Sequence, residues 1–434
     1  MNAVPQDPGP RTQDLAAAYN ATPVATPNFD GVTSPPRPPG NPLTGGRRRI
    51  STPVLAGIGP ERLRIALVCD WFLPRIGGLE LHLRDLAEHL NAAGHTAEVI
   101  TSTPGDSVVD GIRVHRIQAR RLRGADVIWT RAGMQAVQHL VAHGRYDVVH
   151  SHFSVVSPVA YAGARAAQRV GLASVLTFHS MPRGPRFVLG LIGRALGLRR
   201  WPAIVSAVST TAAEAVAPLV AQRPILRLPN GIDPALWRVA YGPKDPNEVH
   251  LVTVMRLKRK KRAAALIRAV AELGKRVPDH TFWLRIIGDG PERRKLERLV
   301  RKLGLQENVF FLGYRTREQI RDLFADADIF VMPSKMESFG LAALEARTAG
   351  LPVVAMAETG VADFIHEERE GLLATSDEHL VEQLTRLARD TELRERIAEN
   401  NRDRLPPVAW QGVIARHVRL YRESIAMRMP TDGR

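Results

Sequence analysis

The segment 333–345 carries polar groups at a spacing that could bind a phosphorylated ligand. It follows one apolar run and leads into another, an order that predicts a strand, a loop and a helix, with Ser338 as the helix N-cap. The free N–H groups at the helix start would then belong to Phe339, Gly340 and Leu341. Because the helix dipole favours negative charge at this end, the segment predicts an anion site that needs no metal.

Two carboxylates flank this predicted helix start. Glu337 precedes it and Glu345 follows eight positions later, so a rise of 1.5 Å per residue separates them by about 10 Å along the axis. Carboxylates accept hydrogen bonds from paired sugar hydroxyls. An isolated glutamate would be interpreted as a solvated surface residue, whereas this place between strand and helix favours a ligand that spans both carboxylates.

The elements that must position these groups alternate along the chain. An apolar strand at 65–69, a Pro/Gly loop at 74–78 and a helical period through 79–90 form the first strand-loop-helix unit. Gly77 and Gly78 lack a Cβ, so this loop could approach a ligand closely, although a two-glycine loop is also a common turn. Further strands are expected at 97–101, 148–150, 174–178, 203–208, 249–254, 281–287, 309–312, 329–332 and 353–355.

This alternation predicts an α/β protein with two Rossmann-like, doubly wound parallel-sheet domains that face each other across a cleft. The expected divisions are a disordered Pro/Gly-rich tail at 1–60, a first domain at 61–238, a second at 239–405 and a helix at 406–434 that returns to the first domain.

Composition limits the possible partners. The 434 residues carry a formal charge of +16, which attracts anions in general, but no nucleic-acid recognition motif occurs and no nucleic-acid partner is expected. The single cysteine, Cys69, excludes an intramolecular disulfide and a cysteine-based metal site. Because neither a signal peptide nor a membrane-spanning stretch is found, we expect a cytoplasmic protein. The sequence does not define an oligomeric state.

Several short segments, in this order, resemble glycosyltransferase family 4, whose members have the GT-B fold. The resemblance covers residues 62–425. It rests on the Glu337-to-Glu345 segment with Phe-Gly-Leu between, and on the segments Gly77-Gly78-Leu79-Glu80, Thr177-Phe178-His179, Pro229-Asn230-Gly231-Ile232-Asp233, Arg256 with Lys261, and Gly288-Asp289-Gly290-Pro291.

The resemblance implies a retaining, metal-independent transferase without a cofactor and without a protein nucleophile, in which the departing phosphate deprotonates the acceptor. Positioned cations can neutralise the diphosphate that leaves. The expected catalytic residues are Arg256, Lys261, Glu337 and His179, and the expected donor-binding residues are Gly77, Gly78, Gly288, Ser338, Phe339, Gly340, Leu341 and Glu345.

By this resemblance Glu337 would bind hydroxyls of the transferred sugar and Glu345 the donor ribose. One departure concerns the basic segment, where Arg262 stands in place of the family's usual glycine after the lysine. Because lysines are adjacent here, Lys260 remains an alternative to Lys261. The pair His150 and His152 has no third ligand at a helical offset, so it does not predict a metal site.

The acceptor is expected to be a glycan or a lipid. Segments 70–80 and 150–154 resemble enzymes that glycosylate phosphatidylinositol, and segment 185–201 mixes apolar residues with arginines, as a helix on an anionic membrane surface would. A core helix with arginines at its edge is the equal alternative. We therefore expect transfer of a hexose or N-acetylhexosamine from a UDP- or GDP-sugar to an acceptor hydroxyl, with a phosphoinositide-like lipid at the inner face of the cytoplasmic membrane as one candidate.

Other functions fit these residues less well. A soluble small molecule or a polysaccharide would be the alternative acceptor. A non-catalytic nucleotide-sugar-binding protein would need neither the Arg/Lys pair nor two aligned carboxylates. A nicotinamide dehydrogenase would carry Gly-x-Gly-x-x-Gly after its first strand, and segment 70–78 lacks it.

Overall fold

The computed structural model describes residues 61–118, 130–182, 184–221, 223–242 and 245–428. The tail predicted at 1–60 lies outside the described residues. Within those that are described, no helix combines the length and the apolar character needed to cross a bilayer.

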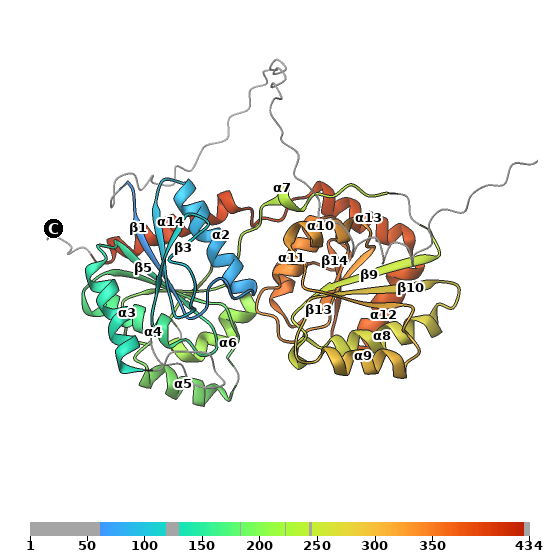
Figure 1. Cartoon of the computed structure of the whole chain (residues 1–434), viewed down its shortest axis with the longest axis horizontal. Helices are drawn as coiled ribbons and strands as arrows, with labels where there is room; N and C mark the ends of the chain where they lie inside the picture. The colour runs from blue at the N-terminus through green and yellow to red at the C-terminus, as the bar shows by residue number, and fades with distance from the viewer. Residues whose placement is uncertain (1–60, 119–129, 183, 222, 243–244, 429–434) are drawn as a thin grey trace, which may run out of the picture. The chain divides into compact units, whose positions relative to one another are not determined.

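The first sheet has eight strands in the order β3-β4-β2-β1-β5-β6-β7-β8, and all neighbours are parallel except β3 and β4 (Figure 1). Its strands are β1 (Arg64–Cys69), β2 (Thr96–Thr101), β3 (Val108–Val109), β4 (Ile112–Arg116), β5 (Val148–Phe153), β6 (Ala173–Phe178), β7 (Ile204–Ala207) and β8 (Ile225–Arg227).

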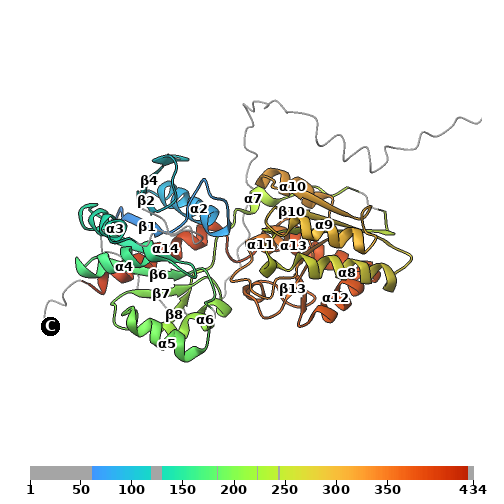
Figure 2. The ribbon, with the colours of Figure 1, turned by 60° about the horizontal axis from the view of Figure 1, so that its bottom comes forward.

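Crossover helices connect these strands, because a parallel sheet needs a connection that returns the chain to the same edge. They are α2 (Gly78–Ala92), α3 (Arg131–His143), α4 (Pro158–Arg169), α5 (Arg186–Ala195) and α6 (Thr210–Val220), followed by the short α7 (Pro234–Trp237). Figure 2 shows α5 next to α6, beyond β8.

The second sheet is parallel throughout and has six strands in the order β11-β10-β9-β12-β13-β14. Its strands are β9 (Glu248–Val254), β10 (Thr281–Ile287), β11 (Val309–Gly313), β12 (Ile329–Met332), β13 (Val353–Met356) and β14 (Gly371–Ala374). Its helices are η1 (Arg259–Lys261), α8 (Ala263–Arg276), α9 (Arg293–Lys302), α10 (Arg317–Ala325), α11 (Leu341–Thr348), η2 (Gly360–Asp363), α12 (Asp377–Arg389) and α13 (Thr391–Asp403).

The last helix, α14 (Trp410–Ala426), packs on the first sheet although it follows the second one in the chain. Ser424 Oγ accepts a hydrogen bond from the Ser174 amide at 2.9 Å and donates one to the Ser174 carbonyl at 3.1 Å. The Tyr421 hydroxyl meets His150 Nδ1 at 2.8 Å. These contacts join segments far apart in the chain, since 250 positions separate Ser174 from Ser424.

The expected fold class, two Rossmann-like parallel-sheet domains of the GT-B type, is confirmed. Each predicted strand overlaps an observed one, and β10 and β12 have the predicted bounds. Four of the described strands were not predicted, and three of them, β3, β8 and β14, lie at sheet edges. Short edge strands bury one side only and leave a weak apolar pattern.

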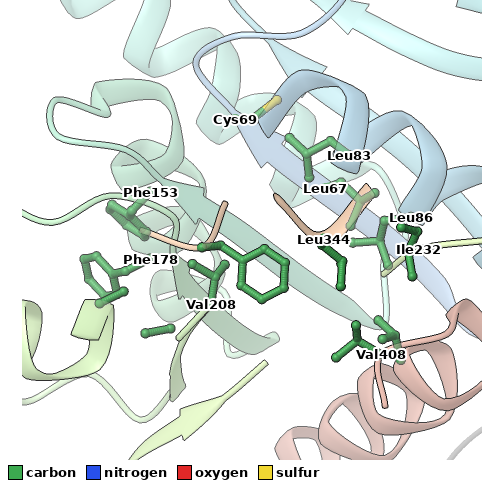
Figure 3. Packing of buried hydrophobic residues seen from close by; sticks show 14 of the residues in the cluster. Leu67, Cys69, Leu83, Leu86, Phe153, Phe178, Val208, Ile232, Leu344 and Val408 are labelled. Atoms are coloured by element: carbon green, nitrogen blue, oxygen red, sulfur yellow. The ribbon is translucent and has the colours of Figure 1, made fainter. Parts of the chain in front are cut away.

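Buried apolar side chains hold the helices against the sheet. Leu67 of β1 packs in one cluster with Leu83 and Leu86 of α2, and Leu344 of α11 belongs to the same cluster (Figure 3). The predicted apolar period of α2 is therefore its sheet-facing side, which directs the polar residues between those leucines toward other parts of the protein.

Candidate functional site

The helix that was predicted to start at Ser338 begins further along the chain. Gly340, with φ of 94°, is the N-cap of α11, and the helix begins at Leu341. The prediction that Ser338 caps the helix is wrong, because its carbonyl instead accepts a hydrogen bond from Ser209 Oγ at 2.5 Å and the chain turns at Gly340. Only glycine adopts this left-handed conformation without strain.

This later start changes which groups face a ligand. The Phe339 side chain is 4% exposed and packs against Phe364, with ring centroids 5.4 Å apart, so only its backbone could reach a ligand. The amides of Leu341 and Ala342 lie in the first turn of α11, where no intrahelical acceptor is available. The spacing of about 10 Å expected between Glu337 and Glu345 assumed a continuous helix and does not apply, since only Glu345 is helical.

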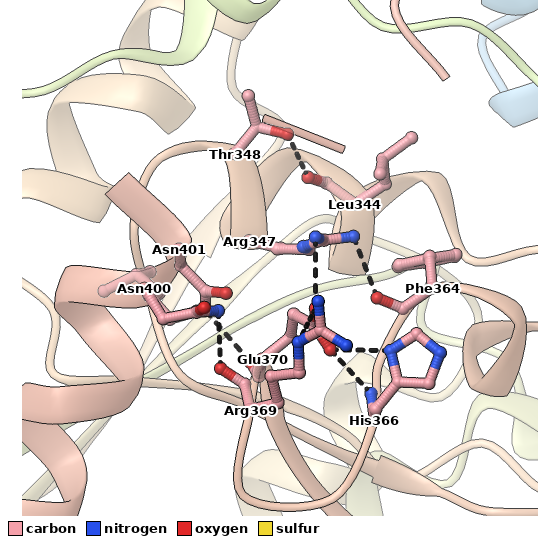
Figure 4. A network of polar contacts seen from close by, with 10 residues as sticks. Leu344, Arg347, Thr348, Phe364, His366, Arg369, Glu370, Asn400 and Asn401 are labelled. Carbon is pink, nitrogen blue, oxygen red and sulfur yellow. Dashed lines mark hydrogen bonds and ion pairs between the residues drawn. The ribbon is translucent and has the colours of Figure 1, made fainter. Parts of the chain in front are cut away.

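A buried polar network fixes the far end of α11 (Figure 4). The Arg347 guanidinium donates to the Phe364 carbonyl at 2.9 Å and pairs with Glu370 at 3.4 Å. Asn401 donates to the Leu351 and Glu370 carbonyls at 2.8 and 2.9 Å. A densely paired network of this kind is rigid, and it holds α11 so that Glu345 keeps one orientation.

The basic segment after β9 brings a lysine to the first of the two carboxylates. Lys261 Nζ forms an ion pair with Glu337, and both side chains are mostly buried. The ambiguity between the adjacent lysines is thereby resolved in favour of Lys261, since Lys260 is exposed. Arg256 is also exposed, and it acts electrostatically on Glu80 of α2.

Arg262, which departs from the family pattern, occupies a conformation that suits glycine. Its φ is 62°, and it ends η1 and precedes α8. An ion pair with Asp377 and a hydrogen bond of 3.0 Å to the Pro333 carbonyl hold the side chain. These contacts compensate for the left-handed backbone, so the arginine is structural at this position.

Gly288 supports the basic segment from the end of β10. Its φ is 119°, and a Cβ here would overlap the Met255 carbonyl. The Leu257 amide donates to the Asp289 carbonyl at 2.9 Å, and a Cβ at Gly290 would overlap the Leu257 carbonyl. The glycines thus let two backbone segments approach each other, which places Arg256 and Lys261.

The first turns of α2 lie close to α11. Gly77 is the N-cap of α2, and a Cβ at Gly78 would lie 3.4 Å from the Leu341 side chain. Glu80 pairs with Arg75 at 3.4 Å. Burial raises the pKa of Glu80, while Arg75 and Arg256 oppose this rise. Glu80 was part of the recognised glycine segment but was not predicted as a site residue.

Two further charged residues surround Glu345. Arg317 donates to both carboxylate oxygens of Asp85 at 3.1 and 2.7 Å. Burial raises the pKa of Glu345 to about 7, an effect that Arg317 opposes and Asp85 increases. Neither Asp85 nor Arg317 was predicted, and because they are 232 positions apart no spacing signal connects them.

His179 lies at the end of β6, in contact with other histidines. Its Nε2 meets His152 Nδ1 at 3.0 Å, and its ring centroid is 5.6 Å from that of His82. Burial, together with the electrostatic effect of His417, lowers the pKa of His179 to about 3, so the ring is neutral near pH 7. Throughout the described ranges, no group of three or more His, Cys, Asp or Glu side chains is arranged to hold a metal ion.

The arrangement connects the predicted residues through α2. Gly78 contacts Leu341, Arg256 acts on Glu80, Asp85 binds the arginine that acts on Glu345, and His82 faces His179. The combination of cations, two carboxylates and free helix amides could bind a diphosphate together with hydroxyl groups.

Two family models match the chain, one in each half. The model described as Glycosyltransferase Family 4 matches residues 76–236, and the model described as Glycosyl transferases group 1 matches residues 240–404. The first match contains Gly77, Gly78 and His179, and the second contains Lys261, Glu337 and Glu345.

Relatives and solved structures agree with these matches. A D-inositol 3-phosphate glycosyltransferase of Pseudarthrobacter chlorophenolicus is 30% identical over 330 residues, which cover 68% of this chain and 78% of that protein. A phosphatidylinositol N-acetylglucosaminyltransferase of Arabidopsis thaliana is 26% identical over 71% of this chain and 70% of its own length. The crystal structure of Anabaena HepE in complex with UDP and glucose superposes with a TM-score of 0.63 at 22% identity, covering 84% of this chain and 98% of that one.

Proposed function

This chain belongs to the family 4 and group 1 glycosyltransferases, and on that premise we propose that it transfers a hexose or N-acetylhexosamine from a UDP- or GDP-sugar to an acceptor hydroxyl, with retention of configuration and without a metal ion. The observation that carries the proposal is the convergence of Lys261, Glu337 and the start of α11 at the end of two neighbouring strands, β9 and β12. Open parallel sheets bind ligands at this edge.

In the proposed mechanism the cations act on the leaving group. As the bond between the sugar and the diphosphate breaks, charge accumulates on the phosphate oxygens, and Arg256 and Lys261 stabilise it. The first-turn amides of α11 add partial positive charge. The acceptor hydroxyl attacks on the face from which the diphosphate leaves, and its proton passes to a phosphate oxygen, so no protein nucleophile is required.

The carboxylates orient the donor. Glu337 accepts hydrogen bonds from hydroxyls of the transferred sugar, and Glu345 accepts them from the ribose. Because Lys261 pairs with Glu337 in the ligand-free protein, donor binding replaces this pair by contacts of each partner with the substrate. This exchange keeps both charges compensated, which limits the cost of their burial.

A nucleotide screen tests the proposal. UDP, GDP and ADP are added separately, and the melting temperature Tm is measured by differential scanning fluorimetry. A ligand at 100 times its Kd stabilises the native state by about 2.7 kcal/mol, so one nucleotide should raise Tm by several degrees. Slow hydrolysis of the matching nucleotide sugar without acceptor, in the presence of chelator, would distinguish a transferase from a binding protein. Absence of any shift with all three nucleotides would contradict the proposal.

For the acceptor we propose a lipid with a phosphoinositide-like headgroup, because α5 presents apolar side chains to solvent. Phe187 is 71% exposed, Leu191 61% and Ile192 44%, and the neighbouring Arg186 and Arg194 are exposed as well. An apolar helix face with arginines beside it fits the interface of an anionic bilayer. The alternative of a core helix does not hold for this face, although Leu189, Gly190 and Gly193 on the opposite side are buried.

Flotation with vesicles tests this surface. Wild type should rise with vesicles of phosphatidylcholine and phosphatidylglycerol, and the double variant Phe187→Ser, Leu191→Ser should not. Each lost apolar contact weakens binding by about 1.5 kcal/mol, which is about tenfold in Kd. Val108→Ser is the matched control, because Val108 is similarly exposed but lies on β3. If wild type stays unbound, a soluble acceptor becomes the better hypothesis.

A further inference from the structure

Five histidines gather where the carboxyl ends of β5 and β6 meet α2 and α14. They are His82, His150, His152, His179 and His417. Burial is the main cause that lowers the pKa of each, so all five rings are neutral near pH 7. A neutral imidazole carries one proton on one of two nitrogens, so the hydrogen bonds in this group decide which nitrogen of each ring can donate.

His150 is the ring whose two nitrogens both have partners. Its Nδ1 meets the Tyr421 hydroxyl at 2.8 Å and its Nε2 meets Thr177 Oγ1 at 2.6 Å. Hydroxyl groups can donate or accept, so these contacts satisfy His150 in either tautomer. This ring therefore does not determine the tautomer of its neighbours.

His152 is different, because only one of its nitrogens has a partner. Its Nδ1 meets His179 Nε2 at 3.0 Å, whereas its Nε2 is buried and lacks a partner among the described residues. His152 is 1% exposed. One proton must lie between the two rings, on His152 Nδ1 or on His179 Nε2, and the unpartnered nitrogen discriminates between these arrangements.

If His179 Nε2 carried the shared proton, the proton of His152 would have to sit on its buried Nε2 with nothing to accept it. A buried N–H without an acceptor is rare in proteins and costs about 1–3 kcal/mol. If His152 Nδ1 carries the shared proton, only a lone pair is left without a partner. The second arrangement is favoured, and it requires the proton of His179 to be on Nδ1.

We propose that His152 is a positioning residue that fixes His179 as the Nδ1–H tautomer, so that His179 offers a hydrogen-bond donor to the substrate and does not act as a base. No described residue occupies the Nδ1 of His179. The His179 amide donates to the Phe153 carbonyl at 2.8 Å, which fixes the backbone that carries the ring. The substrate part of this inference rests on the proposed function, and it names an oxygen of the donor or acceptor as the group that Nδ1–H binds.

Two variants separate the hydrogen bond from the packing of the ring. In His152→Asn the amide nitrogen can take the place of Nδ1 and still donate to His179. In His152→Phe the ring volume remains but the donor is lost. His139→Phe is the control, because His139 lies on α3, where its ring contacts His143 and none of the five histidines.

The tautomer is measured first, by nitrogen-15 NMR of histidine-labelled full-length protein. Wild type and His152→Asn should show His179 protonated at Nδ1, and His152→Phe should show a mixture. Protonation of His179 at Nε2 in wild type would overturn the inference, whatever the activity and even if neither variant folds.

Transfer kinetics form the second readout. In His152→Phe we expect kcat to fall by about tenfold with the donor KM little changed, and His152→Asn should recover most of this loss, since one hydrogen bond contributes about 1 kcal/mol. An Nδ1–H tautomer together with unchanged kcat in His152→Phe would refute the positioning role. If wild type lacks transfer activity, the proposed function fails while the tautomer result still decides the structural claim.

Discussion

Replacing Lys261 with alanine is expected to lower kcat/KM by about 10²–10³, the loss typical of removing one group that stabilises charge in a transition state. Lys261 is one of two cations placed to neutralise the departing diphosphate, and it reaches the site through its pair with Glu337. The effect should appear mainly in kcat, because the phosphate charge grows as the bond breaks. Steady-state kinetics with the nucleotide sugar found in the screen would measure it.

Part of that loss could come from Glu337, which the substitution leaves without its partner. Breaking one side of a buried pair destabilises a protein more than removing the whole pair. The double variant Lys261→Ala, Glu337→Gln should therefore recover stability in urea unfolding but not activity. Recovery of activity in the double variant would mean that Lys261 serves only to compensate the carboxylate.

Nearby lysines provide matched controls. Lys275→Ala removes an exposed charge on α8 and should change kcat/KM by less than about twofold, as surface substitutions usually do. Lys260→Ala should also have a small effect, because the neighbouring Lys261 is the one that meets Glu337. Activity that disappears with chelator and returns with manganese would contradict the metal-independent mechanism, as would full activity in an Arg256→Ala, Lys260→Ala, Lys261→Ala triple variant.

Replacing Glu345 with glutamine should raise the Tm of the nucleotide-free protein at pH 8 by several degrees. Burial raises the pKa of this carboxyl from 4.5 to about 7 in the folded protein. Between these values the unfolded chain has already lost the proton that the folded protein still holds, so stability falls as pH rises from about 4.5 to about 7. The full penalty, on the order of 1–3 kcal/mol after allowing for partial exposure, persists above pH 7.

Glutamine has no charge to bury, so the Tm difference between variant and wild type should vanish near pH 4.5 and be largest at pH 8. Glu382→Gln on the exposed side of α12 is the control and should show no such dependence. A difference that is independent of pH would mean that the Glu345 carboxyl is not desolvated in the folded protein.

The same residue also decides nucleotide binding. Glu345→Ala should abolish the Tm increase caused by the nucleotide that stabilises wild type, because the ribose hydroxyls lose their acceptor. An undiminished increase in Glu345→Ala would show that the ribose lies elsewhere. Greater stability without ligand and weaker response to ligand would together identify a residue that is kept for binding at the expense of stability.

The sequence by itself determined the architecture and the chain-local parts of the site. Continuous apolar runs such as Ile329–Met332 are typical of strands buried on both faces, and their alternation with helical periods is sufficient to predict two parallel sheets. The glycine, basic and Glu337-to-Glu345 segments were found because each lies within a few residues of a strand end, where their order along the chain reflects their position at the sheet edge.

Only the tertiary structure decided how these segments meet. The start of α11 depends on a turn at Gly340 and on the Ser209 contact to Ser338, which a helical pattern cannot reveal. The bond between Asp85 and Arg317 and the histidine group join residues from separate elements. Local patterns record which side of an element is buried, whereas a pair of polar residues from distant elements leaves no period in the sequence, and folding alone brings such residues together.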